Sequence, residues 1–256
     1  MRLTRCFVDV PLAGAATLEL PAGPSAHIAK VLRLRPGAAL TLFDGRGGEY
    51  EAQILAPDGG GVRVRVGAHH ALEREAPVAV TLLQCLARGE RMDWIVQKAT
   101  ELGAAAIVPV ASERCVVRLD EAGAQRRALH WQAVAVAACE QCGRNRLPQL
   151  PPALSFERAC VLGSQAEARL LFEPAASATL WDALTALRAG PVSGLRLLIG
   201  PEGGLSEEEV AMAERHGFRA CRLGPRILRA ETAPLAALAA IQTLLGDFGE
   251  RDCATN

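Results

Sequence analysis

The stretch LRLLIGPEGGLSEEE, residues 195–209, decides the fold of this chain. Its first part, residues 195–199, is a short and mostly apolar run, which is typical of a buried strand in a parallel sheet. The glycine-rich loop 200–204 follows. Ser206 then begins a predicted helix, because its hydroxyl can accept from a first-turn N–H while Glu209 reaches back to the Ser206 N–H in a capping box. Strand, loop and helix in this order predict one unit of an α/β domain.

A second unit of the same kind follows directly. Gly217 ends the first helix, as a left-handed C′ glycine usually does, and residues 218–223 are the next predicted strand. The loop 223–231 leads to a last apolar helix at residues 234–245, for which Thr232 is a candidate cap. Both loops leave the carboxyl ends of strands. We therefore expect them to meet at the sheet edge where open α/β sheets bind ligands.

The rest of the chain divides into two predicted domains and a tail. Residues 1–75 are rich in short strands and contain one amphipathic helix at 25–34, with Ser25 as a candidate cap, which predicts a small β-barrel or half-barrel. Residues 76–248 alternate strands with helices, which predicts a parallel sheet covered by helices on both faces. Residues 249–256 form a predicted frayed tail. Further strands are predicted at 6–10, 39–43, 49–54, 62–66, 78–85, 106–110 and 169–172, and further helices at 90–102, 120–142 and 179–188.

Composition excludes several classes of function. The formal net charge of the 256 residues is zero, so binding of nucleic acid through bulk charge is not expected and would need a local basic patch. No run is long and apolar enough to span a membrane, and the N-terminus lacks the core of a signal peptide, so we expect a cytoplasmic protein. The eight cysteines are scattered, which favours thiols over a disulfide framework. Neither the pair Cys139 and Cys142 nor the histidines have metal-ligand spacing, so no metal is expected.

The two glycine loops are not common nucleotide motifs. Residues 200–204 lack the Gly-Lys-Ser/Thr of a P-loop and do not match GxGxxG. Each loop taken alone is equally well explained as a tight turn in which glycine relieves backbone strain. Two such loops at one sheet edge can present backbone N–H and C=O groups to a flat, polar ligand such as adenine, with Leu223, Ile227 and Leu228 as apolar walls.

Motifs stand along nearly the whole chain, namely LLIGPEGGLSEEE (197–209), LGPRILRAETAPLAALAAIQ (223–242), RGERM (88–92), QKATELG (97–103), SERC (112–115), ACEQCGRN (138–145), HIAKVLR (27–33) and LFDG (42–45). Taken together, they resemble the ribosomal RNA small-subunit methyltransferase E family. This resemblance implies an enzyme that methylates N3 of a uridine in 16S ribosomal RNA with S-adenosylmethionine as cofactor. It also implies an N-terminal PUA-like β-barrel, a C-terminal SPOUT domain whose parallel sheet contains a trefoil knot, and a homodimer.

The resemblance also assigns roles to residues. In catalysis, Arg229 would stabilise the deprotonated uracil, and Glu231 would either accept the proton or serve only at the helix start. RNA would contact Arg114 and the loop of Arg144, Asn145 and Arg146, with Lys30 and Arg33 on a second surface. The implied cofactor contacts are Leu171, Ile199, Gly200, Gly203, Leu223, Gly224, Ile227, Leu228 and Ala233.

Two other functions stay open from the sequence. One is a SPOUT enzyme that methylates the ribose 2′-OH of RNA, which shares the knot and differs in the methylated nucleoside. The other is an RNA-binding module that has lost catalysis. Intact cofactor loops argue against the second alternative, and a failure to bind S-adenosylmethionine would favour it.

Overall fold

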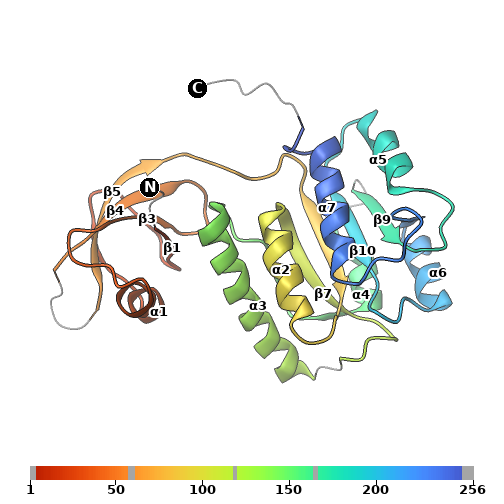
Figure 1. Cartoon of the computed structure of the whole chain (residues 1–256), viewed down its shortest axis with the longest axis horizontal. Helices are drawn as coiled ribbons and strands as arrows, with labels where there is room; N and C mark the ends of the chain where they lie inside the picture. The colour runs from red at the N-terminus through yellow and green to blue at the C-terminus, as the bar shows by residue number, and fades with distance from the viewer. Residues whose placement is uncertain (1–3, 57–60, 118–119, 164–166, 250–256) are drawn as a thin grey trace. The chain divides into compact units, whose positions relative to one another are not determined.

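The computed structural model describes residues 4–56, 61–117, 120–163 and 167–249 (Figure 1). It contains two compact units. Unit 1 consists of Met1–Glu75 together with Val136–Leu147, and unit 2 consists of Ala76–Ala135 together with Pro148–Asn256. Apart from its first residue, the predicted tail at 249–256 lies outside the described residues. Each unit has a sheet and a hydrophobic core of its own.

Unit 1 contains a five-stranded sheet with the strand order β1-β3-β4-β5-β2. β1 runs parallel to β3, and the other neighbouring pairs are antiparallel. Alternate residues along β3 to β5, such as Leu40, Leu42, Val64 and Val66, are buried in one core, as period-two patterning requires. The predicted strands at 39–43 and 49–54 are confirmed, whereas β2 was not predicted. The strands are β1 (Arg5–Phe7), β2 (Thr17–Glu19), β3 (Ala39–Phe43), β4 (Glu49–Ile54) and β5 (Arg63–His70).

The helix of unit 1 begins earlier than its sequence suggested. It starts after Pro21 as α1 (Ala22–Ala26) and continues as a π-helical turn, η1 (His27–Val31). The prediction that Ser25 caps this helix is wrong. Its hydroxyl donates to the Leu20 carbonyl over 2.8 Å and accepts from the Val62 N–H over 3.2 Å, so it ties the helix to the sheet.

Unit 2 contains a six-stranded sheet with the order β11-β9-β10-β6-β7-β8, and every pair is parallel. The predicted parallel sheet is therefore confirmed. β10, which begins the deciding stretch, is buried along its whole length between β9 and β6. The strands are β6 (Val80–Cys85), β7 (Ala104–Ala111), β8 (Leu154–Ser155), β9 (Ala168–Phe172), β10 (Leu195–Ile199) and β11 (Arg219–Cys221).

Helices cover both faces of this sheet. Right-handed crossovers from β6 to β7 and from β9 to β10 place α2 and α5 on one face, and crossovers in the opposite direction place α4 and α6 on the other. The last helix, α7, packs between α2 and α5 (Figure 1). β8 and α4 were not predicted. The helices are α2 (Arg91–Glu101), α3 (Glu121–Cys142), which begins in unit 2 and ends in unit 1, α4 (Phe156–Val161), α5 (Leu180–Arg188), α6 (Glu207–Arg215) and α7 (Thr232–Leu244).

The caps of the last two helices differ. Ser206 and Glu209 form the predicted capping box of α6, and Gly217 follows that helix with a φ of 83°. The prediction that Thr232 caps α7 is wrong, because Thr232 is already the first helical residue. Glu231 occupies the N-cap position and makes no side-chain capping bond. The Glu231 carboxylate is therefore available for other contacts.

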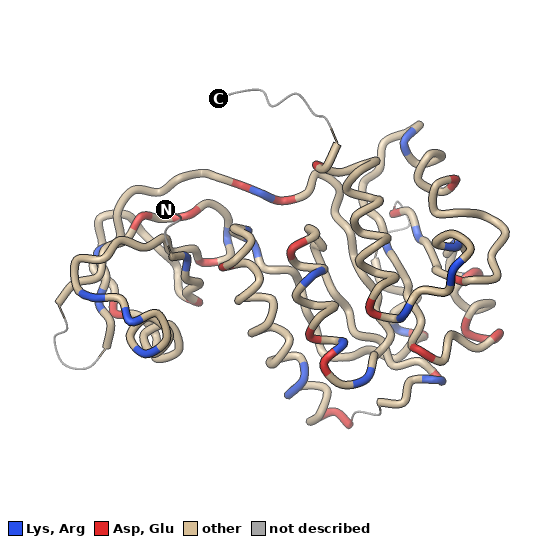
Figure 2. Tube along the Cα trace, viewed as in Figure 1, with Lys and Arg blue, Asp and Glu red and all other residues tan. Residues whose placement is uncertain are grey.

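Charged residues of both signs are interspersed along both units (Figure 2). This distribution agrees with the formal net charge of zero. Among the described residues, no helix combines the length and the apolar character needed to cross a membrane.

Candidate functional site

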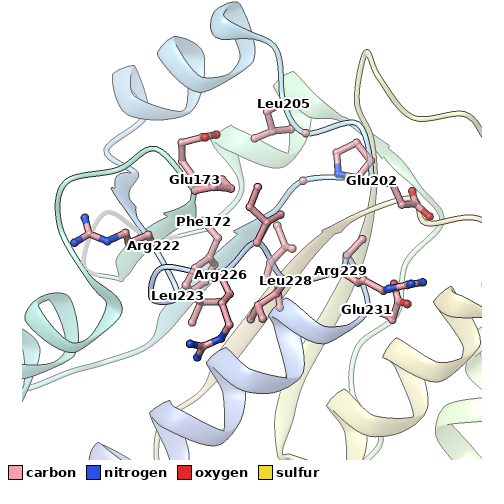
Figure 3. Close-up of a pocket in the computed structure, with 18 of the residues that line it drawn as sticks. Phe172, Glu173, Glu202, Leu205, Arg222, Leu223, Arg226, Leu228, Arg229 and Glu231 are labelled. Atoms are coloured by element: carbon pink, nitrogen blue, oxygen red, sulfur yellow. The ribbon is translucent and has the colours of Figure 1, made fainter.

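A cavity of about 480 Å³ lies at the carboxyl edge of the unit 2 sheet (Figure 3). Its walls come from the carboxyl ends of β9, β10 and β11, from the segments that follow them, and from the starts of α2 and α7. This volume is within the range of small-molecule sites. The cavity is lined by Arg91, Phe172, Glu173, Pro174, Ile199, Gly200, Pro201, Glu202, Gly204, Leu205, Cys221, Arg222, Leu223, Gly224, Arg226, Ile227, Leu228, Arg229, Ala230, Glu231 and Ala233.

The structure brings most of the predicted cofactor residues together in this cavity. The residues that line it are Ile199, Gly200, Leu223, Gly224, Ile227, Leu228 and Ala233. Leu171 does not line it, because this side chain is fully buried in β9, and the next residue, Phe172, faces the cavity instead. Gly203 is also absent from the lining, and its backbone lies against Arg114, with 3.3 Å between a Cβ built on Gly203 and the Arg114 Cβ.

Charged side chains occupy opposite ends of the cavity. Both predicted catalytic residues, Arg229 and Glu231, line one end together with Glu202 (Figure 3). Arg222 lies at the other end, where its Nη1 donates to the Ala176 carbonyl over 2.6 Å and fixes the segment after β9. A ligand in the cavity would therefore meet both acidic and basic groups beside apolar walls.

Arg91 and Glu202 belong to the site although no role was predicted for them. Arg91 begins α2, and its Nη1 donates to Glu202 Oε1 over 2.5 Å. The same carboxylate oxygen accepts from the Arg88 N–H over 3.1 Å. Partial burial of Glu202 opposes its ionisation, but the Arg88 N–H and the Arg91 guanidinium outweigh this effect and hold the pKa of Glu202 below its usual range. Both residues lie within motifs of the sequence, yet only the fold joins them.

The loop that carries Arg114 is attached to the start of α6. The Glu113 N–H donates to Glu209 Oε1 over 2.8 Å, so the capping carboxylate of α6 also holds this loop. Arg114 itself is exposed, and its Nη1 lies 3.4 Å from the Gly203 carbonyl oxygen. The predicted RNA contact at Arg114 therefore has an accessible cation beside the loop 200–204.

The structure does not support direct RNA contacts by Arg144 and Asn145. Both side chains are buried in unit 1, with residue exposures of 4% and 0%. Arg144 pairs with Glu75, and Asn145 accepts from Arg5 Nη2 and donates to the Leu72 carbonyl, each over 2.5 Å. These groups hold the end of α3 to the strands of unit 1, so their polar atoms are already used.

The other predicted RNA residues of unit 1 are accessible. Arg146 has a side chain that is 52% exposed and pairs with Glu73 over 3.3 Å. Lys30 and Arg33 are both exposed, and Arg33 has a left-handed backbone with a φ of 52°. Such a conformation is uncommon for a residue other than glycine.

Cys139, the first cysteine of the Cys139 and Cys142 pair, is a buried thiol. Burial raises the pKa of the Cys139 thiol to about 12, and its Sγ donates to the Arg146 carbonyl over 3.6 Å. Within the described ranges, no group of three or more His, Cys, Asp or Glu side chains could hold a metal ion.

Known proteins match both parts of the chain. A model described as an RNA methyltransferase domain matches residues 74–242, and a model described as an RNA methyltransferase PUA domain matches residues 25–67. The Ribosomal RNA small subunit methyltransferase E of Bacillus subtilis (strain 168) is 34% identical over 245 residues, which cover 93% of this chain and 96% of that relative.

Solved structures show the same fold. The crystal structure of a Ribosomal RNA small subunit methyltransferase E from Neisseria gonorrhoeae bound to S-adenosyl methionine is 37% identical, with a TM-score of 0.88, and the match covers 96% of this chain and 100% of that one. A putative methyltransferase from Legionella pneumophila, in complex with the bound cofactor SAM, is 35% identical, with a TM-score of 0.89 and coverage of 97% and 100%. This chain belongs to the ribosomal RNA small subunit methyltransferase E family.

Proposed function

We propose that this protein methylates small-subunit ribosomal RNA with S-adenosylmethionine, and that the acceptor is N3 of a uridine in 16S ribosomal RNA. The observation that carries the proposal is the cavity that Arg229 and Glu231 line together with apolar side chains of the loop 223–228. Relatives at 34% and 37% identity bear the name ribosomal RNA small subunit methyltransferase E, and one of them is described as bound to S-adenosyl methionine.

The residues of the cavity fit this cofactor. Leu223, Ile227 and Leu228 supply apolar walls for a purine ring, and the loop backbone can satisfy its polar edge. Arg222 and Arg226 suit the cofactor's carboxylate, whereas Glu173 suits its ammonium group. When bound, S-adenosylmethionine supplies an electrophilic methyl group on a sulfonium centre.

Glu231 and Arg229 have separate roles in the deprotonation of the uracil. The N3–H of uracil is a weak acid, so this bond must break before N3 can attack the methyl carbon. Glu231 Oε2 is buried, and none of the described residues gives it a hydrogen bond, so this atom can take the proton. The Arg229 guanidinium stabilises the negative charge that develops on the ring carbonyl oxygens. The N3–C bond then forms as the methyl–sulfur bond breaks, and its electron pair stays on sulfur.

RNA recognition is the role we propose for Arg114, Arg146, Lys30 and Arg33. All four side chains are accessible. Each phosphate contact that is lost should weaken binding and flatten the salt dependence by about one unit of log–log slope. Substitution of Arg114 or Arg146 by Met, with binding measured at several salt concentrations, tests this role, and an unchanged slope would contradict it.

The remaining parts of the proposal concern assembly. We propose that residues 1–75 act as a PUA-like RNA-binding domain, residues 76–248 as the methyltransferase domain, and the whole as a cytoplasmic homodimer. The trefoil knot stays a prediction. It is supported by the convergence of the segments at 172–174, 199–205 and 221–233 on one cavity.

The decisive experiment identifies the methylated nucleoside. Purified protein is incubated with S-adenosylmethionine and small ribosomal subunits that lack the modification, and the RNA is then digested and analysed by mass. We expect 3-methyluridine. Detection of a 2′-O-methyl nucleoside would leave the fold assignment unchanged and would show that the acceptor is a ribose hydroxyl and not N3 of uridine. No methylation, together with no cofactor binding by calorimetry, would favour a non-catalytic RNA-binding module.

A further inference from the structure

Arg91 links two carboxylates that lie far apart in the sequence and come together at one end of the cavity. Its Nη1 donates to Glu202 Oε1 over 2.5 Å, and its Nε lies 3.7 Å from Glu231 Oε1. The Arg91 side chain is 38% exposed, whereas those of Glu202 and Glu231 are 26% and 20% exposed. One guanidinium therefore bridges the loop after β10 and the start of α7.

Glu202 fixes the position of Arg91. Its Oε1 accepts hydrogen bonds both from the Arg91 guanidinium and from the Arg88 backbone N–H, which lies in the turn just before α2. The carboxylate thus holds the first turn of α2 against the loop 200–204. A planar guanidinium with several donors is suited to serve a second carboxylate in the same plane.

Among the residues that the structure describes, Arg91 is the one group that contacts the Glu231 carboxylate as an ion pair. Glu231 occupies the N-cap position of α7 without a side-chain capping bond, so the helix does not hold its side chain. The described residues place one cation, Arg91, within ion-pair distance of it, on the Oε1 side. Oε2 is buried and receives no hydrogen bond from any described residue. The Arg91 contact on Oε1 therefore leaves Oε2 as the carboxylate oxygen without a hydrogen-bond partner among the described residues.

We propose that Arg91 is a positioning residue, which holds Glu231 through Oε1 so that Oε2 meets the N3–H of the uracil, and that Glu202 keeps Arg91 in place. This inference rests on the proposed function. The proton moves from N3 to Glu231 Oε2, while Arg91 gains and loses no proton. The same bridge joins Glu231 to Glu202 in the loop 200–204. It therefore fixes the position of the proton acceptor relative to the cofactor cavity.

The test compares variants of Arg91 with a matched variant on the same helix. Arg91→Met removes the bridge, Arg91→Lys keeps the charge without the planar fork, and Glu202→Gln weakens the anchor. Lys98→Met is the control, because Lys98 is another α2 cation in an ion pair, with Glu101 over 2.8 Å, and it does not line the cavity. Single-turnover methylation of small ribosomal subunits is measured at saturating S-adenosylmethionine, with cofactor affinity measured by calorimetry.

A misplacement of the acceptor should lower the rate rather than the affinity. We expect Arg91→Met to slow single turnover by about 10- to 100-fold while cofactor affinity changes less than about threefold. Arg91→Lys should recover part of the rate. Glu202→Gln should have a rate between those of the wild type and Arg91→Met, and Lys98→Met should match the wild type. Crystal structures of the wild type and Arg91→Met should show the Glu231 carboxylate displaced only in the variant.

A double-mutant cycle separates positioning from a general structural role. If Arg91 acts through Glu231, adding Arg91→Met to Glu231→Gln should slow the reaction no further. Additive losses would overturn the proposal, as would a wild-type rate in Arg91→Met. If Arg91→Met melts at a lower temperature than the wild type, Glu202→Gln replaces it in the cycle with Glu231→Gln. Additive losses in that cycle would also overturn the proposal. If the wild type itself does not methylate RNA, the proposed function fails and this inference falls with it.

Discussion

Arg144 Nη2 donates to Glu75 Oε2 over 2.5 Å, and Arg144 Nε donates to Glu75 Oε1 over 3.1 Å. The Arg144 side chain is only 5% exposed, and that of Glu75 is 24% exposed. The pair joins Arg144, the second residue after α3, to Glu75, the last residue of the first segment of unit 1. It is thus an internal connection of unit 1.

Arg144→Met should destabilise the protein, because it leaves the partly buried Glu75 carboxylate without its partner. We expect a loss of about 3 kcal/mol in the free energy of unfolding, measured with urea. Arg146→Met is the control, since the exposed Arg146–Glu73 pair should contribute no more than about 1 kcal/mol. Unchanged stability of Arg144→Met together with weaker RNA binding would restore the direct phosphate contact predicted from sequence.

Glu49 makes the stability of unit 1 depend on pH. Burial of this carboxyl opposes ionisation, but hydrogen bonds and charge from Arg5 and Arg74 outweigh it and hold the pKa of Glu49 below 4.5, its ordinary value. A carboxyl whose pKa is lowered by folding stabilises the protein above its unfolded pKa, and this contribution is lost as pH falls through the folded value.

We therefore expect the stability gap between the wild type and Glu49→Gln to be largest near neutral pH and to shrink below 4.5. Urea unfolding at a series of pH values measures this gap. Glu51→Gln, on the same strand with a side chain 65% exposed, is the control and should show a small gap throughout. A Glu49→Gln gap that stays constant down to acid pH would contradict the expectation.

Gly224 has a backbone conformation that other residues rarely adopt. Its φ is 79°, it lines the cavity, and a Cβ built on it would meet no atom within 4 Å, so the cost of Gly224→Ala comes from the backbone alone. We expect Gly224→Ala to lower the free energy of unfolding by about 1–2 kcal/mol. The affinity for the cofactor should become roughly tenfold weaker, because the loop 223–228 shifts. Calorimetry with S-adenosylmethionine measures the affinity. Gly190→Ala, at an open position without positive φ, should leave it unchanged.

Glu209 joins the cap of α6 to the loop of Arg114. Its two carboxylate oxygens accept from the Ser206 N–H over 3.1 Å and from the Glu113 N–H over 2.8 Å. Glu209→Ala should lower the free energy of unfolding by about 2–3 kcal/mol, because both N–H groups lose their partner. It should also weaken cofactor binding. Ser155→Ala removes the cap of α4 and should cost about 1 kcal/mol without any effect on the cofactor. Equal effects of both substitutions on cofactor affinity would refute the link.

Arg229 should act on the rate of methyl transfer. If its guanidinium stabilises the uracil anion, Arg229→Met should slow single turnover by about 10²- to 10³-fold, with cofactor affinity nearly unchanged. Arg229→Lys should be intermediate, since it keeps the charge. Pre-steady-state methylation at saturating cofactor measures the rate. A variant that binds the cofactor poorly yet reacts at the normal rate when saturated would make Arg229 a cofactor-binding residue instead.

Local sequence signals predicted much of this structure. The capping box of α6 and the glycine after it follow from the hydrogen-bonding capacity of Ser206 and Glu209 and from the backbone freedom of Gly217. The apolar run at 195–199 predicted a buried strand, since both faces of a covered parallel sheet exclude water. Motif resemblance supplied seven cofactor residues and two catalytic residues that line the cavity.

Contacts between distant segments decided the rest. The family resemblance made Arg144 an RNA-binding candidate, but its partner Glu75 lies 69 positions away, and only folding brings them together. Likewise, Arg91 and Glu202 are 111 positions apart, so the bridge that orients Glu231 could not be predicted from the sequence. The sequence by itself determined the α/β pattern, the capping box of α6 and the loops of the cavity, because these depend on neighbouring residues. Only the tertiary structure decided which charges are buried in pairs and which face the cavity, because burial and ion pairing depend on the packing of segments remote in the chain.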